Sequence, residues 1–373
     1  MPESPPPLAD RITAAVDALP LPDSWPGTPW SPRAETTAWL YSQRSVHTRR
    51  AYFQDLAQYL RWLDAVGRSP TQVTKADLDT YVFFLRQQDP PPSAASLNRR
   101  LAALSSWYRY LVEEGMATRN PVVGVRRVPT NRDYSATVGL AVAEVRAFLQ
   151  AADAAVERWG YGSPLRRTAE RDRLLVTMLA TLGLRVSEAT GLNLSDLRHN
   201  AGHRTVVIRG KGGRVRELPV PAVLGRLLDE HVPIQRQENE RNIRIEASRM
   251  STRAQSAEPY EEEARRKIGD PLFTTNPVFN TNLGSRLSQA SVFALVRRLA
   301  RAAKLPAADR ISPHGLRHSA ATAALADGAA LHEVQDLLGH ADPRSTRRYD
   351  RNRGALDRSP AHRLAMLYGE QGG

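Results

Sequence analysis

"RTVVIRGKGGRVRELPV", residues 204–220, is the stretch of sequence that decides the fold. Two runs rich in β-branched residues flank Gly-Lys-Gly-Gly, and their apolar side chains recur with a period of two. This pattern is typical of a β-hairpin with Lys211 in or beside its turn. Because most of the remaining chain has helical periodicity, the sequence predicts a mainly α protein with a small β-sheet, an α+β fold.

The segments on both sides of the hairpin are predicted to be helical. The stretch "ERDRLLVTMLATLGL" before it carries a helical apolar stripe at Leu174, Leu175, Met178, Leu179 and Leu182. Residues 286–368 return to a helical period, punctuated by proline and glycine. Residues 233–270 are polar and charged, so we expect a solvated helix or a flexible insertion there. Residues 140–373 are therefore predicted to form one domain that ends in a tail at 351–373.

A helical domain is predicted before it, over residues 34–128. The stretch "SVHTRRAYFQDLAQYLRWLDAVG" places Tyr52, Leu56, Leu60 and Leu63 on one helix face, and Thr74 is a plausible cap for the next helix. Residues 129–139 have no consistent period and are the expected linker. The proline-rich residues 1–33 are expected to be a mostly disordered arm, the alternative being a short docking contact through Trp25 or Trp30.

Composition narrows the class of protein. A chain of 373 residues is long enough for two domains, and a formal charge of +13 favours an acidic partner, with nucleic acid the first candidate. The absence of cysteine excludes disulfides, thiolate metal sites and cysteine nucleophiles. No apolar run approaches the length of about 18 residues that a membrane span needs, and no signal peptide is recognisable, so we expect a soluble, cytoplasmic protein.

Four stretches of the second domain place a cation or a proton-transfer group next to a turn or a helix start. They are "LGLRVSE", "RGKGGR", "SPHGLRHSAAT" and "GHADPRSTRRYD", and they carry Arg185, Lys211, His314 with Arg317, and His340 with Tyr349. His314 and Arg317 are three residues apart and share a helix face, so both can reach one anion. Arginine suits a phosphate because its planar fork donates two parallel hydrogen bonds.

These residue types fit a displacement at a phosphodiester. Fixed arginines stabilise the charge that builds on the non-bridging oxygens without a metal ion. A tyrosine phenol, with an ordinary pKa of about 10, becomes a useful nucleophile when a base or a positive field helps to remove its proton. A lysine on a mobile hairpin can protonate the departing 5′-oxygen.

Each of these residues also has an ordinary structural explanation when it is taken alone. Arg185 could be a surface cation, Lys211 a solvated loop residue, and His314 with Arg317 a structural pair at a helix start. His340 could cap a helix and Tyr349 could pack in the core. The joint order and spacing of the six residues favour a common site.

Together these stretches resemble the tyrosine recombinases, the phage-integrase family, and most of all its bacterial Xer-type and transposon-integrase members. The resemblance covers residues 34–350, because the helices before the linker are also similar to the family's core-binding domain. It implies an N-terminal helical core-binding (SAM-like) domain and a C-terminal catalytic domain that form a clamp on duplex DNA.

The resemblance also implies roles for the site residues. Arg185 and Arg317 would hold the scissile phosphate, and Lys211 would protonate the leaving 5′-oxygen. His314 would assist proton transfer, and His340 would hydrogen-bond the phosphate or the nucleophile. Tyr349 would form a 3′-phosphotyrosyl link, and Glu188 would support the site. No metal, ATP or other cofactor is implied.

The resemblance also implies binding partners. The family implies specific double-stranded DNA sites and a homotetramer or heterotetramer on DNA, with no membrane contact. Candidate DNA-binding residues are Arg99, Arg100, Arg109 and Arg286. The tail, apolar at Leu364, Leu367 and Tyr368, either docks on the next subunit or packs on its own domain. Two features depart from the family: the length of the 233–270 segment, and a proline-rich start unlike an arm-type DNA-binding domain.

Three other functions are weighed against site-specific recombination. A type IB topoisomerase shares the phosphotyrosyl chemistry but relaxes one duplex without exchanging strands. A DNA-binding or architectural protein with a silent catalytic set would give no covalent adduct. A metal-dependent nuclease is weakest, because the candidate site is rich in arginine and lacks a carboxylate cluster for magnesium.

Overall fold

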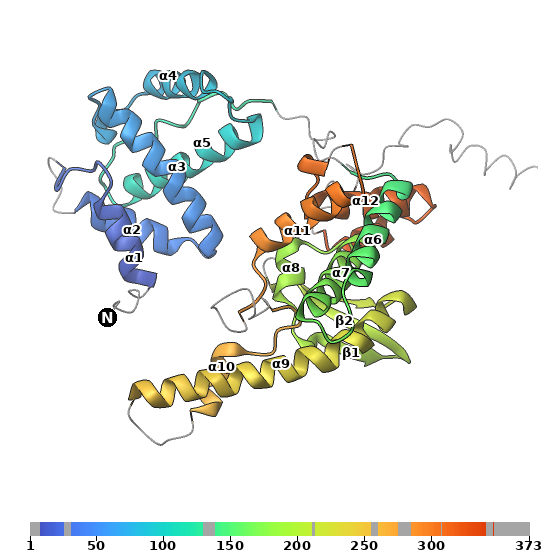
Figure 1. Ribbon diagram of the computed structural model, residues 1–373. Helices are drawn as coiled ribbons and strands as arrows, with labels where there is room; N and C mark the ends of the chain where they lie inside the picture. Colours follow the sequence, from blue (N-terminus) through green and yellow to red (C-terminus); the bar gives the residue numbers. More distant parts are fainter. Residues whose placement is uncertain are drawn as a thin grey trace, which may run out of the picture. The chain divides into compact units, whose positions relative to one another are not determined.

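The chain divides into two compact units, Met1–Asn131 and Arg132–Gly373. The computed structural model describes residues 8–25, 31–129, 139–210, 213–254, 260–274, 285–306, 308–340 and 346. Figure 1 shows the helices and strands of each unit, and each unit has a hydrophobic core of its own. The boundary between the units falls in the stretch expected to be a linker, of which residues 130–138 lie outside the described residues.

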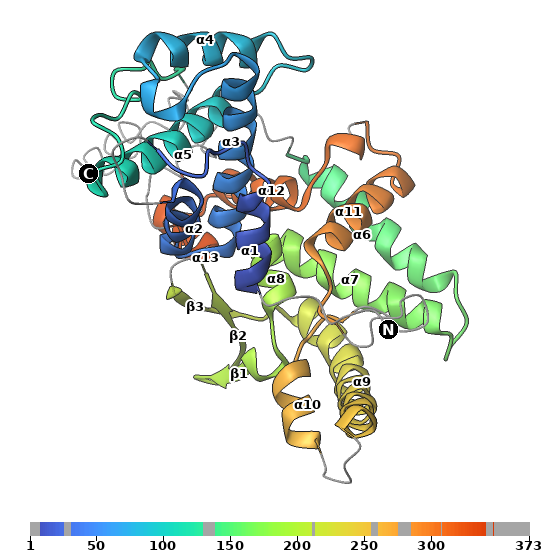
Figure 2. The same ribbon diagram turned by 90° about the vertical axis from the view of Figure 1, so that its left-hand side faces the viewer.

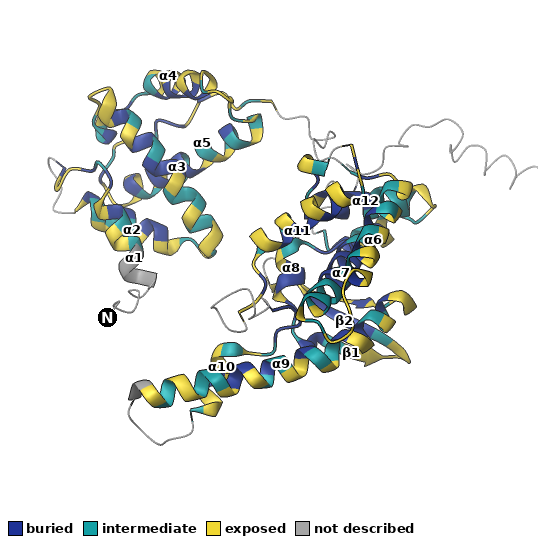
Figure 3. Ribbon diagram, viewed as in Figure 1, coloured by how far each residue is buried: buried dark blue, intermediate teal, exposed yellow. Residues whose placement is uncertain are grey.

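The described part of the first unit is all helical. Its elements are α1 (Leu8–Asp17), α2 (Pro32–Ser42), α3 (Val46–Ala65), the short 3-10 turn η1 (Pro70–Gln72), α4 (Lys75–Arg86) and α5 (Ala94–Glu113). Helices α3 and α5 pack against each other, and α2 contacts both. Figure 3 shows the buried faces of these helices turned toward one another.

Local sequence signals explain these helices. The predicted stripe on α3 is confirmed, since Leu56, Leu60 and Leu63 are buried and Tyr52 stacks on a tryptophan of α2. The predicted cap is also confirmed: the Thr74 backbone N–H donates to Asp77 Oδ2 at 2.8 Å, and the Thr74 hydroxyl accepts from the Asp77 N–H at 3.4 Å. This reciprocal pair satisfies two backbone donors at the start of α4.

The N-terminal segment differs from the mostly disordered arm that the sequence predicts for residues 1–33. Helix α1 forms, and Leu19, Leu21 and Trp25 after it are buried in the core of the first unit. The indole of Trp25 meets that of Trp107 edge to face, with ring centroids 6.4 Å apart. The prolines interrupt the helical periodicity of this segment, but its large apolar side chains are still buried by the hydrophobic effect. Trp30 lies outside the described residues.

The second unit surrounds helix α7 with helices and one small sheet. Its helices are α6 (Val142–Glu157), α7 (Pro164–Leu182), α8 (Val186–Gly191), α9 (Ala222–Ala254), α10 (Glu261–Ile268), α11 (Gln289–Ala302), α12 (Pro313–Ala326) and α13 (Leu331–Leu338), with 3-10 turns η2 (Leu194–Asp196) and η4 (Ala308–Arg310). All five predicted apolar residues of α7 are buried, which confirms that stripe. The mainly α fold with a small β-sheet is thereby confirmed.

The sheet has three antiparallel strands in the order β1-β2-β3 (Figure 2). The predicted hairpin is β2 (His203–Arg209) with β3 (Val215–Pro219), in the register Val206 with Leu218 and Ile208 with Arg216. Strand β1 (Leu197–Asn200), "LRHN", is too short and polar to give a strand signal and was not predicted. It joins the sheet by pairing with the edge of β2.

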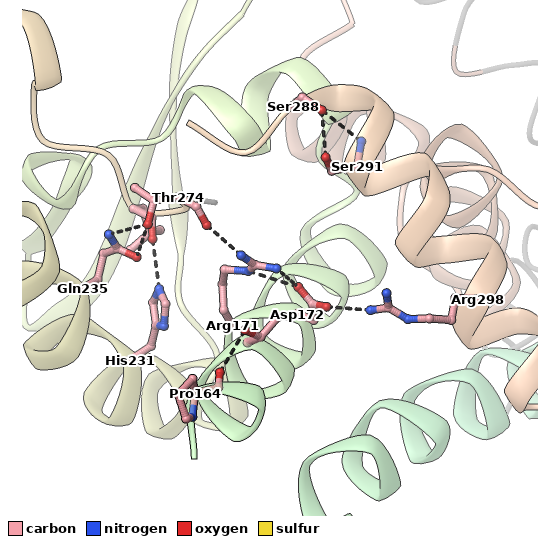
Figure 4. A network of polar contacts seen from close by, with 11 residues as sticks. Pro164, Arg171, Asp172, His231, Gln235, Thr274, Ser288, Ser291 and Arg298 are labelled. Carbon is pink, nitrogen blue, oxygen red and sulfur yellow. Dashed lines mark hydrogen bonds and ion pairs between the residues drawn. The ribbon is translucent and has the colours of Figure 1, made fainter. Parts of the chain in front are cut away.

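The polar segment 233–270 contains most of α9 and all of α10, which lie side by side (Figures 1 and 2). Buried polar residues fix α9 to residues 271–274, since His231 Nε2 is 2.9 Å from the Leu272 carbonyl and Gln235 Nε2 donates to Thr274 Oγ1 at 3.0 Å (Figure 4). The described residues of this segment are thus mainly helical, and buried polar side chains of α9 bind residues 271–274. Even α9 is polar, and within the described ranges no helix is both long and apolar enough to cross a membrane.

The buried position of Trp25 gives a stability test of the docked N-terminal segment. Trp25→Ala should lower the free energy of unfolding of the first unit by about 3 kcal/mol, because it leaves a cavity beside Trp107. Urea denaturation followed by circular dichroism measures this. Phe83→Ala, which removes an exposed aromatic side chain of α4, is the matched control and should change stability by less than about 1 kcal/mol. Equal stability of Trp25→Ala and the wild type would contradict the docked segment.

Candidate active site

A buried carboxylate, Glu188, lies at the centre of the candidate site. Helix α7 ends at Gly183, whose φ of 58° is left-handed, and the chain turns directly into α8 through Arg185. The Arg185 backbone N–H donates to Glu188 Oε2 at 2.9 Å, and Arg185 Nη1 donates to Oε1 at 2.6 Å. Glycine is required at position 183 because a Cβ atom there would lie 2.6 Å from Leu338 Cδ2. The tight turn therefore places Arg185, which is expected to bind phosphate, against the buried carboxylate of Glu188.

A second arginine, Arg216 of β3, binds the same carboxylate with both arms of its guanidinium. Its Nη1 donates to Glu188 Oε1 at 3.1 Å and its Nη2 to Oε2 at 2.8 Å. Its Nε donates to the Leu337 carbonyl at 3.1 Å. Sequence reasoning missed Arg216. The available signal was the strand alternation, which puts Arg216 on the same inward face as Leu218 and so demands a buried counter-ion.

Arg317 of α12 completes a group of three arginines around Glu188. Only 1% of Arg317 is exposed, and its Nη1 lies 3.9 Å from Glu188 Oε2. Its Nη1 and Nη2 each donate at 2.6 Å, to the carbonyls of Gly183 and Leu338 respectively. Helix α12 starts sharply before it, because Ser312 caps the Gly315 N–H at 3.2 Å and Pro313 occupies the first turn.

The arginines account for the ionisation of Glu188. Burial raises the pKa of this carboxyl, but hydrogen bonds from Arg216 and Arg185 outweigh burial and hold the pKa below its ordinary value. Glu188 is therefore a carboxylate at neutral pH. It neutralises only part of the positive charge of three guanidinium groups, so the site keeps an excess positive charge that can attract an anion.

Two histidines lie in the field of the same arginines. Desolvation of the ring, followed by the charges of Arg317 and Arg185, lowers the pKa of His314, which stands in the first turn of α12. Burial and the same two arginines lower the pKa of His340 to about 4. His340 Nδ1 lies 2.9 Å from Thr346 Oγ1. Both rings are therefore neutral at pH 7 and able to exchange protons.

The structure brings together five of the seven predicted catalytic and supporting residues: Arg185, Glu188, His314, Arg317 and His340. Lys211 and Tyr349 lie outside the described residues. The residue before Lys211 lies at the site, since a Cβ atom at Gly210 would be 3.6 Å from Glu188 Oε1. The Gly210 N–H also donates to the Arg214 carbonyl at 2.7 Å, which closes the base of the hairpin turn.

The predicted DNA-binding arginines are dispersed. In the first unit, Arg99 pairs with buried Asp55, and Arg100 Nε lies 3.9 Å from the same carboxyl. Arg109 is exposed on α5. In the second unit, Arg286 donates to the Leu192 carbonyl at 3.0 Å and to Asn193 Oδ1. The contacts of Arg286 are structural, whereas Arg99 keeps about half of its side chain exposed.

The depressed pKa of His340 gives a pH test of the site. An unfolded histidine has a pKa of 6.5, so between pH 6.5 and about 4 the unfolded chain takes up a proton that His340 in the folded chain does not. This contribution of His340 lowers the free energy of unfolding as the pH falls through that window. His340→Asn should remove it, so urea unfolding of the variant should lose less stability between pH 7 and pH 5. Identical pH dependence of variant and wild type would show that His340 is not held neutral.

Comparisons with known proteins agree with this arrangement. Residues 140–355 match the model of the phage integrase family, and residues 37–115 match that of the phage integrase N-terminal SAM-like domain. The predicted pair of a SAM-like domain and a catalytic domain is thereby confirmed.

Curated relatives and solved structures point the same way. The chain is 31% identical over 326 residues to tyrosine recombinase XerD of Mycobacterium leprae, covering 83% of this chain and 89% of the relative. It is 28% identical over 307 residues to XerD of Listeria monocytogenes, covering 82% and 88%. The XerH recombinase in a post-cleavage complex with difH has the same fold, with a TM-score of 0.61 at 19% identity over 97% of this chain and 94% of that one. With most of its length matched, this chain belongs to the phage integrase family, the tyrosine recombinases.

Proposed function

We propose that this chain is a site-specific recombinase that cuts and rejoins duplex DNA through a 3′-phosphotyrosyl intermediate at Tyr349. The observation that carries the proposal is that Arg185 and Arg317, from separate parts of the sequence, converge on one buried carboxylate, while His314 and His340 lie in the field of these two arginines. The relatives named above are tyrosine recombinases, and XerH was captured with its difH substrate after cleavage.

Arg185 and Arg317 bind the scissile phosphate in this mechanism. Both guanidiniums are fixed by contacts to Glu188 or to backbone carbonyls, so little reorganisation is needed when charge develops on the non-bridging oxygens. Arg185 has 35% of its side chain exposed and meets the phosphate first. Only 1% of Arg317 is exposed, so the atoms that cover it must be displaced when the phosphate binds, while its guanidinium is already held by the Gly183 and Leu338 carbonyls.

The proton transfers follow from the remaining groups. The Tyr349 phenol loses its proton to a neutral ring, His314 or His340, and its oxygen attacks phosphorus. The P–O bond to the 5′-oxygen breaks as the P–O bond to tyrosine forms, and Lys211 protonates the departing 5′-oxygen. Thr346, which precedes Tyr349 by three residues in the sequence, contacts His340, and this contact supports the assignment.

The covalent link conserves the energy of the broken phosphodiester. A 5′-hydroxyl from a second duplex can attack phosphorus, release the tyrosine and restore a phosphodiester, so no nucleotide or metal is consumed. Exchange between two duplexes requires a protomer at each half of each site, which we propose is met by a homotetramer or heterotetramer. Since chromosomal or mobile DNA is the substrate, we place the enzyme in the cytoplasm.

Affinity for DNA comes first from phosphate contacts. The net charge of +13 supplies a sequence-independent term that weakens steeply as salt concentration rises. In the first unit, Arg99 Nη1 pairs with Asp55, and 46% of the Arg99 side chain stays exposed. We propose Arg99, Arg100 and Arg109 of α5 as phosphate contacts, in a clamp formed by both units around the duplex. The structural contacts of Arg286 make it the weakest candidate of the four.

Trapping of the covalent intermediate tests the proposed function. The protein is incubated in EDTA with duplex fragments of its own replicon, the reaction is stopped in denaturant, and DNA bound to protein is sequenced. Wild-type protein should give adducts at a defined site. Tyr349→Phe should give none, because the ring lacks the oxygen that forms the bond.

A matched control and a second substrate sharpen this experiment. Tyr161→Phe removes the hydroxyl of a tyrosine that is 93% exposed in the same unit, and it should form adducts at the wild-type level. Two differently labelled duplexes carrying the trapped site should then exchange strands. Relaxation of supercoiled DNA without exchange would instead indicate a topoisomerase, and binding without adducts a silent DNA-binding protein.

A further inference from the structure

Arg216 connects three parts of the second unit that are far apart in the sequence. It stands on β3 opposite Ile208 of β2, it holds Glu188 of α8 by two hydrogen bonds, and its Nε donates to the Leu337 carbonyl in the last turn of α13. Figure 2 shows β3 next to the end of α13. Leu337 lies three residues before His340 in the sequence. Through the Leu337 carbonyl, Arg216 therefore contacts the turn that carries this histidine.

The backbone at that turn leaves room for the side chain of Arg216. Helix α13 ends at Gly339, whose φ of 62° is left-handed. A Cβ atom at this position would lie 2.7 Å from Arg216 Nη1, 3.0 Å from its Cδ and 3.1 Å from its Cζ. Glycine therefore serves two purposes here, the backbone conformation and the close approach of the guanidinium. The side chain of Arg216 and the backbone of the turn form one packed contact.

Electrostatics favour the same contact. The last carbonyls of a helix have no partner within the helix and carry its partial negative charge. In α13, the Leu337 carbonyl accepts from Arg216 and the Leu338 carbonyl accepts from Arg317. Two guanidiniums thus bind the end of the helix, and both also pair with Glu188.

We propose that Arg216 is a positioning residue that sets the place of His340 relative to the phosphate-binding arginines. It acts through His340 and leaves the hairpin that carries Lys211 in place, because strands β2 and β3 are held by their own pairing from Thr205 to Pro219. The inference rests on the proposed function, since the consequence of a displaced His340 is slower cleavage of DNA.

A double-mutant cycle tests this inference. In the full-length protein, Arg216→Met should slow single-turnover formation of the covalent adduct roughly thirtyfold, while the Kd for DNA changes less than about threefold. In a His340→Ala background the same substitution should slow adduct formation less than about threefold, because the histidine that Arg216 positions is already absent. In a Lys211→Ala background the full factor of roughly thirty should remain.

Arg198→Met is the matched control. Arg198 is an exposed arginine of β1 in the same sheet, so this variant loses the same charge without touching Glu188 or α13, and it should cleave DNA at the wild-type rate. Thermal unfolding shows whether each variant is folded. If Arg216→Met does not fold, Arg216→Lys keeps the charge beside Glu188 but not the forked contacts, and the same cycle is run with it.

The outcomes separate this inference from the proposed function. Failure of the wild type itself to form adducts would refute the recombinase mechanism. Suppose instead that the wild type forms adducts and that Arg216→Met slows adduct formation by the same factor with and without His340. This result would refute a role through His340. A factor that disappears only when Lys211 is absent would assign Arg216 to the hairpin instead and would likewise overturn the proposal.

Discussion

The buried carboxylate of Glu188 is the interaction on which the rest of the site depends. A carboxylate taken out of water costs several kcal/mol unless charged donors replace its hydration. Here Arg185 at the start of α8 and Arg216 of β3 donate to the carboxylate, and Arg317 of α12 adds a third positive charge 3.9 Å away. Each buried or half-buried guanidinium in turn needs the carboxylate. The mutual requirement brings segments that are distant in the sequence to one point, and removal of Glu188 leaves three guanidiniums without their common counter-ion.

The arginines are also fixed on their far sides. The carbonyls of Gly183, Leu337 and Leu338 accept hydrogen bonds from Arg317 or Arg216, so the guanidiniums are held before any DNA arrives. Burial of the ring, followed by the same excess positive charge, lowers the pKa of His340 and keeps this histidine neutral at physiological pH. A site of this kind is organised in advance for a phosphate anion, which reduces the reorganisation needed as charge develops in the reaction. Stability and chemistry therefore rest on the same contacts.

Much of this arrangement could be predicted from the sequence. The hairpin, the α7 stripe and the Thr74 cap follow from short-range patterns, and the structure confirms them. The structure brings Arg185, Glu188, His314, Arg317 and His340 together, while the roles of these residues and of Lys211 and Tyr349 remain predictions.

Arg216 was missed because strand alternation places it on the inward face of the hairpin but does not identify Glu188, its partner on another element. The N-terminal segment was misjudged because proline hides periodicity while large apolar side chains such as Trp25 still become buried. The dependence of the site on Glu188 is tested most directly by the single-turnover rate of adduct formation by Glu188→Gln, which keeps the shape of the side chain and removes its charge. We expect a folded but less stable protein that binds DNA and forms the adduct roughly a hundredfold more slowly. A folded variant that cleaves at the wild-type rate would contradict this dependence.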